Sequence, residues 1–201
     1  MVWVKSEYAE ELAVASAWVS ALVPWSVSVA WGTIGSGTLI EVRFPFFLVR
    51  YLFGVEITGA FDANGIKVLT PPGAADFYAG APSALPFWVW TAAAGVLGIA
   101  VLFSLALYAE EERLLEAPVD PVRVMGALLL VSAVLLSLSS WLLQFGRWPL
   151  GDTPTFPGVL FPVGVLFQFF FAYTLLAVER VDHVGGEAAD GEAPDVATGR
   201  E

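Results

Sequence analysis

Charged and aromatic side chains that could recognise a partner gather between residues 41 and 56. They are Glu41, Arg43, Arg50, Tyr51 and Glu56. Guanidinium groups bind carboxylates and phosphates through paired hydrogen bonds, and tyrosine adds an aromatic face with a polar end. We therefore take this patch as a candidate contact for a partner protein or a lipid headgroup. The alternative is structural, with these residues only bordering a small fold at a membrane interface.

A second polar group recurs at helical spacing. Ser137, Ser140 and Gln144 fall on one face of a predicted helix, and Gln168 lies near the centre of the next apolar segment. Such a face could line a path for a small solute. The alternative is helix packing, in which the hydroxyls bond carbonyls four residues back and the amides bond across helices. The absence of a charged group from this face favours packing.

Several catalytic arrangements are missing from the sequence. It has no HExxH, GxSxG or Walker motif, and it has no cysteine. The one histidine, His183, lies in an acidic terminal segment, where we read it as a solvated side chain rather than a metal ligand. We therefore expect no enzymatic activity, no cofactor and no metal.

The apolar residues set the predicted architecture. Of the 201 residues, 57% are hydrophobic, and they collect into four long uncharged runs. A helix needs about 20 apolar residues to cross a bilayer core of about 30 Å. The runs predict membrane-spanning helices at about 12–31, 86–108, 122–145 and 157–178. Stripes of small residues, such as Ala13, Ala17 and Ala21 on the first helix, predict the faces through which these helices pack against one another.

The connection over residues 33–84 carries the other predicted elements. Thr38–Arg43 is rich in β-branched residues and predicts a strand. Phe46–Phe53 follows a proline and is too short to span, so it predicts a short interfacial helix. Asn64-Gly65 predicts a hairpin turn between 55–58 and 66–69. The predicted fold is thus mainly α: a four-transmembrane-helix bundle with a short interfacial helix and a small antiparallel β-sheet in its first long loop.

The charge balance bears on partners and location. There are 20 acidic and 9 basic residues, giving a net charge of −11, and a basic surface for nucleic acid is absent. Few lysines and many carboxylates suit a cytoplasm of high salt concentration, although an acidic tail on an ordinary protein is the alternative. We predict one domain over residues 1–180 and a disordered acidic tail over 181–201. Basic residues near the predicted helix ends favour cytoplasmic N- and C-termini in a multi-pass protein of the cell membrane.

Three segments resemble a known group of proteins. The opening MVWVKSEYAEELA, the segment GTLIEVRFPFFLVRYLFGVEI and the acidic tail are similar to the uncharacterised four-helix membrane proteins of haloarchaea. The likeness is one of pattern over most of residues 1–180, and it implies a halophilic archaeal cell membrane and no assigned activity. The layout is also similar to claudin-like tetraspans, but the paired loop cysteines of claudins are absent, so that comparison is architectural only.

Two functions of different classes remain open. The first is a non-enzymatic scaffold or accessory subunit, which would bind another membrane protein, or a second copy of the chain, within the lipid bilayer. The second is a small permease or channel lined by the polar helix face. The first predicts co-purification with a defined partner, and the second predicts solute flux.

Overall fold

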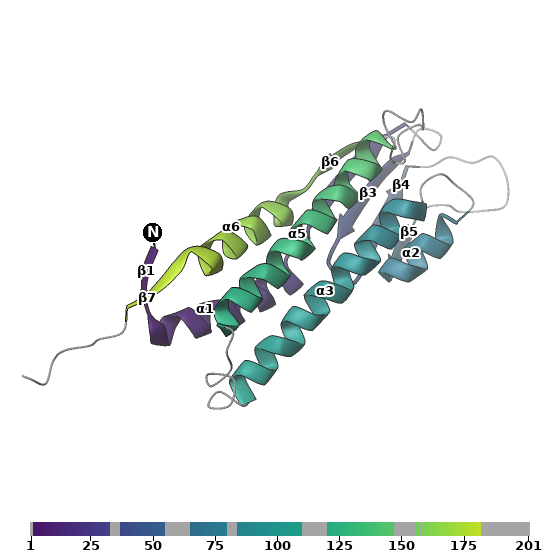
Figure 1. The fold of residues 1–201 in the computed structure, drawn as a ribbon. Helices are drawn as coiled ribbons and strands as arrows, with labels where there is room; N and C mark the ends of the chain where they lie inside the picture. The colour runs from purple at the N-terminus through teal and green to yellow at the C-terminus, as the bar shows by residue number, and fades with distance from the viewer. Residues whose placement is uncertain are drawn as a thin grey trace, which may run out of the picture.

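The computed structural model describes residues 2–32, 37–54, 65–79, 84–109, 120–146, 156 and 158–181. These residues form five helices, a five-stranded sheet and a short two-stranded sheet (Figure 1). The helices are α1 (Ser6–Leu22), α2 (Pro71–Phe77), α3 (Ala84–Ala109), α5 (Pro121–Phe145) and α6 (Val163–Ala177). The strands are β1 (Val2–Lys5), β2 (Ser26–Trp31), β3 (Thr38–Arg43), β4 (Leu48–Phe53), β5 (Gly65–Leu69), β6 (Val159–Phe161) and β7 (Val178–Val181).

The two long helices, α3 and α5, pack side by side and form the axis of the molecule (Figure 1). Helix α6 packs along α5, and α1 packs against α3, α5 and α6. Strands β1 and β7 pair in parallel, so the first and last described residues lie at the same end of the helical layer. The five-stranded sheet lies beside the other end of α3 and α5.

The large sheet is antiparallel throughout, in the order β5-β4-β3-β2-β6. The predicted strand Thr38–Arg43 is confirmed as β3, at the centre of the sheet. Two strands fall inside segments predicted as membrane-spanning helices: β2 follows α1 after a three-residue connection, and β6 precedes α6 by one residue. The sheet therefore extends the helical layer through these two junctions and is not confined to a loop.

The prediction of a four-transmembrane-helix bundle is wrong. Only α3 and α5 among the described helices are long and apolar enough to cross a membrane, and α6 is a shorter apolar helix. Within the predicted helix 12–31, the observed helix α1 ends at Leu22 and strand β2 follows it. Strand β6 occupies the start of the predicted helix 157–178. The physical reason is backbone pairing: Ser26–Trp31 alternates β-branched with small residues and bonds to β3 along its whole length.

The predicted interfacial helix over Phe46–Phe53 is also wrong, because Leu48–Phe53 is strand β4, paired with β3 on one side and β5 on the other. The connection instead contains α2, which the prediction missed. Thr70 caps this helix by accepting a hydrogen bond from the Gly73 amide, and two prolines open it. Residues 55–64 and the acidic tail beyond Val181 lie outside the described part of the chain.

Alanine side chains line the face of α1 that packs against the other helices. Ala9, Ala13, Ala17 and Ala21 are buried in one core cluster with side chains of α3, α5 and α6. Small side chains allow close approach of helix backbones. The small-residue stripe predicted on the first helix therefore packs inside the molecule and is not available to a partner.

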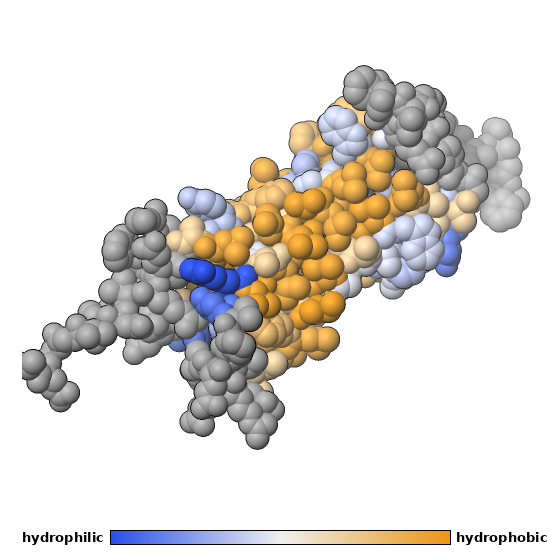
Figure 2. Space-filling model, in the orientation of Figure 1, coloured by the Kyte–Doolittle hydropathy of each residue, from blue (hydrophilic) through white to orange (hydrophobic). Residues whose placement is uncertain are grey.

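The outer surface of the helices is apolar. Figure 2 shows a continuous hydrophobic band over the middle of the molecule, with hydrophilic side chains toward its ends. Of the residues in the most apolar 18-residue stretch of each long helix, 28% are buried in α3 and 44% in α5. Fewer than half of the residues in each stretch are therefore buried inside the fold.

Candidate functional site

The candidate site is a polar cluster on the inner face of the large sheet, which packs against the helices. Residues 41 and 43 lie on the same face of β3 because alternate side chains of a strand point the same way. The strand register places Ser28, Glu41, Arg50 and Lys67 in one row across β2, β3, β4 and β5. Sheet pairing thus brings together residues that are far apart in the sequence.

Glu41 and Arg43 form an ion pair at the centre of this cluster. Both side chains are buried, and Arg43 Nη2 donates to Glu41 Oε2. Arg43 Nη1 donates to Ser28 Oγ at 2.8 Å, and the guanidinium lies 5.4 Å from the ring centre of Phe156. Arg43 Nε is buried and has no hydrogen-bond partner among the described residues. A buried charge is tolerated when it is paired, so this ion pair offsets the cost of burying both side chains.

The other oxygen of Glu41 faces Tyr78 and Arg50. The Tyr78 hydroxyl donates to Glu41 Oε1 at 3.1 Å, and Arg50 Nη1 donates to the same hydroxyl at 3.2 Å. Arg50 Nε lies 3.8 Å from Glu41 Oε1, and 13% of the Arg50 side chain is exposed. One carboxylate therefore faces two guanidinium groups, and the cluster carries a net charge of +1.

Helix α2 and helix α3 hold Tyr78 in place. Tyr78 directly follows α2, and its ring stacks on that of Phe87 in α3, with the planes 2° from parallel and the centres 4.6 Å apart. Burial, followed by the adjacent Glu41 carboxylate, raises the pKa of Tyr78 to about 12. The hydroxyl therefore remains protonated and donates to Glu41, so it cannot act as a base near neutral pH.

The structure brings together three of the five residues predicted as one site. Glu41, Arg43 and Arg50 are in contact as described, whereas Tyr51 points to the opposite face of the sheet and is 37% exposed. Glu56 lies outside the described residues. Sequence reasoning missed Ser28 and Tyr78. Ser28 falls inside a segment read as helix, and only the alternation of valine with serine over 26–29 could have indicated a strand there.

The predicted polar helix face makes internal contacts. Ser137 donates to the carbonyl of Ala133, four residues back. Gln144 uses both ends of its amide to hold β6: Nε2 donates to the Gly158 carbonyl at 3.1 Å, and Oε1 accepts from the Leu160 amide at 3.0 Å. Ser140 Oγ and Gln168 Oε1 are buried, with no hydrogen-bond partner among the described residues.

The opposite face of the large sheet is apolar, and we call it the outer sheet face. No described residue that points to this face carries a charge. Seven of its side chains are exposed, from Tyr51 at 37% to Trp31 at 67%. The face consists of Val27, Val29, Trp31, Thr38, Ile40, Val42, Val49, Tyr51, Phe53, Ile66, Val68, Val159 and Phe161. The sheet thus buries Glu41 and Arg43 on its inner face and exposes hydrophobic side chains on its outer face.

Comparison with known proteins adds a family to this description. No functionally curated protein matches the sequence. A protein family described as "Family of unknown function (DUF7549)" matches residues 2–180, which include all the helices and most of the strands described above. The chain therefore belongs to this family of unknown function, DUF7549.

Proposed function

We propose that the protein is an integral membrane protein that acts as a non-enzymatic scaffold or accessory subunit of a membrane complex. The dimensions of the long helices support the membrane location. Trp88 and Tyr108, both exposed on α3, are separated by 20 residues, or about 30 Å along a helix. This distance matches the hydrocarbon core of a bilayer, and tryptophan and tyrosine are enriched at its two interfaces.

The observation that supports a binding role is the inverted polarity of the sheet. An antiparallel sheet with one face in water normally puts polar side chains on that face. Here the ionised groups Glu41, Arg43 and Arg50 lie on the inner face, whereas the outer sheet face has no charge. Large exposed apolar patches of soluble proteins mark interaction sites. We therefore expect something other than water to cover the outer sheet face.

The turn between β3 and β4 favours another membrane protein as that cover. Its sequence is Phe44-Pro45-Phe46-Phe47, and the Trp90 indole donates to the Pro45 carbonyl at 2.9 Å. The Phe46 ring lies beside Gly98, near the middle of α3. This end of the sheet thus reaches the depth of the apolar helical band. A partner that covers the outer sheet face must itself present an apolar surface at the membrane.

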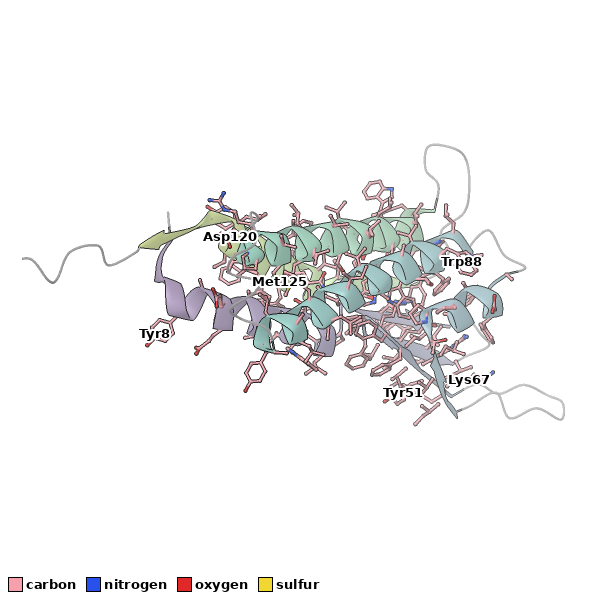
Figure 3. The ribbon with its side chains drawn as sticks, turned by 60° about the horizontal axis from the view of Figure 1, so that its bottom comes forward. Tyr8, Tyr51, Lys67, Trp88, Asp120 and Met125 are labelled. Carbon is pink, nitrogen blue, oxygen red and sulfur yellow. The ribbon has the colours of Figure 1, made fainter. Side chains whose placement is uncertain are left out.

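The proposal includes the cell membrane, with both chain ends in the cytoplasm. The pairing of β1 with β7 supports a common side for the two ends, because Val2–Lys5 lies beside Val178–Val181. The acidic, lysine-poor composition supports a cytoplasm of high salt concentration, as in a halophilic archaeon. Arg123 is exposed and pairs with Asp120, which Figure 3 shows at the same end of the molecule as Tyr8, so it fits the excess of basic residues on cytoplasmic sides.

Affinity purification from native membranes tests the scaffold role. The tagged full-length chain, extracted in mild detergent at high salt, should carry a stoichiometric membrane-protein partner. Val68→Lys places a charge on the outer sheet face and should release this partner. Tyr108→Lys adds the same charge at an exposed position at the far end of α3 and should retain it. A chain that purifies alone, or two variants that behave alike, would refute the proposal.

A small permease or channel is the second candidate, supported by the buried Gln168 Oε1 that lacks a partner among the described residues. Buried polar atoms of this kind are normally satisfied by water or ligand. Flux of small polar solutes into liposomes should then fall in Gln168→Leu. Unchanged flux in that variant would eliminate this path, since Gln144 is already engaged with β6.

A further inference from the structure

Two basic side chains converge on one aromatic ring at the edge of the polar cluster. Arg50 and Lys67 are directly opposite each other on β4 and β5. The Arg50 guanidinium carbon lies 5.6 Å from the centre of the Phe77 ring, and Lys67 Nζ lies 5.2 Å from the same centre. We call Arg50, Lys67 and Phe77 the cationic rim. Like charges directly opposite across antiparallel strands repel and destabilise the pair.

Among the described residues, the one carboxylate paired with the rim does not balance its charge. Glu41 is already paired with Arg43, and its oxygen is 3.8 Å from Arg50. Among the described residues, no carboxylate forms an ion pair with Lys67, which is exposed. The rim is therefore a positive, solvent-accessible feature on a chain whose net charge is −11. An anion at the rim would relieve the repulsion between Arg50 and Lys67.

We propose that the cationic rim binds a phosphate group, supplied by an anionic lipid headgroup or by a free phosphate. Arginine and lysine both donate charge-assisted hydrogen bonds to phosphate oxygens. Phe77, which is 48% exposed, offers an apolar surface for the groups attached to the phosphate. The proposal rests on the membrane location proposed above.

The position of the rim suits a headgroup. Tyr78 follows Phe77 and stacks on Phe87, the residue before Trp88. Figure 3 shows Lys67 and Trp88 at the same end of the molecule, away from Tyr8 and Asp120. Exposed tryptophans of membrane proteins lie at the headgroup level. The rim would therefore meet lipid phosphates where Trp88 marks the interface.

Retention of lipid by the purified full-length chain tests the proposal. The protein is reconstituted in nanodiscs of equal phosphatidylglycerol and phosphatidylcholine, released into mild detergent and analysed by native mass spectrometry. The wild type should retain phosphatidylglycerol preferentially. Lys67→Gln should lower this preference by about fivefold, the loss expected for one lysine beside an anionic surface. Lys67→Arg should restore it.

Arg123→Gln is the matched control. It removes one exposed positive charge at the opposite end of the molecule, where Arg123 already lies 3.8 Å from Asp120. Equal retention of the two lipids by the wild type, or equal effects of Lys67→Gln and Arg123→Gln, would overturn the proposal. Displacement of the retained lipid by added inorganic phosphate would identify free phosphate as a source, and lack of displacement would assign the site to the lipid.

The same preparation separates this proposal from the membrane proposal. A chain that does not insert into the nanodiscs contradicts the membrane location itself. A chain that inserts but shows no preference for the anionic lipid contradicts only the role of the cationic rim.

Discussion

Replacing Glu41 by glutamine should destabilise the protein strongly. The substitution keeps the shape of the side chain and an oxygen for the Tyr78 hydroxyl, but it removes the only carboxylate that faces Arg43 and Arg50 among the described residues. Arg43 is fully buried and cannot recover its charge balance from water. Removing one partner of a buried ion pair costs about 3–5 kcal/mol. We expect Glu41→Gln to lower the free energy of unfolding by this amount.

The assay is reversible unfolding in mild detergent by titration with a denaturing detergent, followed by tryptophan fluorescence, to which the buried Trp25 and Trp90 contribute. Asp120→Asn is the matched control, since it neutralises a carboxylate in an exposed ion pair with Arg123 and keeps an N-cap residue. That change should cost at most about 1 kcal/mol.

A second variant keeps the reasoning on Glu41 testable even if Glu41→Gln folds poorly. Glu41→Gln combined with Arg43→Met removes the unpaired buried charge together with its partner. Replacement of both members of a buried pair is often neutral or stabilising, so the double variant should recover most of the lost stability. A Glu41→Gln cost as small as that of Asp120→Asn, or a double variant less stable than the single one, would refute the reasoning.

Three further predictions concern other contacts. Because the pKa of Tyr78 is raised from 10.0 to about 12, the folded state keeps this proton longer than the unfolded state, so the contribution of Tyr78 to the free energy of unfolding should be constant below pH 10 and fall by about 1.4 kcal/mol per pH unit from there to about pH 12. Alkaline unfolding should show this slope in the wild type and lose it in Tyr78→Phe. A Cβ on Gly164 would lie 2.5 Å from the Pro24 carbonyl oxygen, so Gly164→Ala should cost about 1–3 kcal/mol in thermal or detergent unfolding, whereas Gly95→Ala, which meets open space on α3, should stabilise by up to about 1 kcal/mol. Gln144→Leu removes both hydrogen bonds that hold β6 and should cost about 1–3 kcal/mol, with faster amide hydrogen exchange in β6 as the local readout.

Helices α3 and α5 were predictable to within two residues at each end, because each contains a long uncharged run with clear boundaries. Asp120 and Pro121 mark the start of α5 as N-cap and first helical residue. The boundaries of α1 and α6 were not predictable from apolar composition. In both segments hydrophobicity continues into a strand, and pairing with distant strands decides the backbone conformation there.

The candidate site was predictable only in part. Glu41 and Arg43 alternate on one strand, so their common face follows from the sequence. Tyr78 contributes to the site only because α2, which begins 30 residues after Glu41, packs beside β3. No local pattern in the sequence indicates this packing. The motif Thr70-Pro71-Pro72 could have revealed α2 as a capped helix, since threonine before proline is typical of a helix start. The inverted polarity of the sheet became visible only once β2 and β4 were known to pair with β3, and β5 with β4.

The location of α3 in lipid is the central claim, and depth measurement by spin labelling tests it most directly. The chain has no cysteine, so single cysteines can be placed without background labelling. Spin labels at Trp88, Ile99 and Tyr108, all exposed on α3, would be compared in reconstituted vesicles for collision with oxygen and with a water-soluble nickel chelate. The label at Ile99, near the midpoint of the other two, should show the highest oxygen and the lowest nickel accessibility. Nickel accessibility at Ile99 equal to that at Tyr108 would contradict the membrane location.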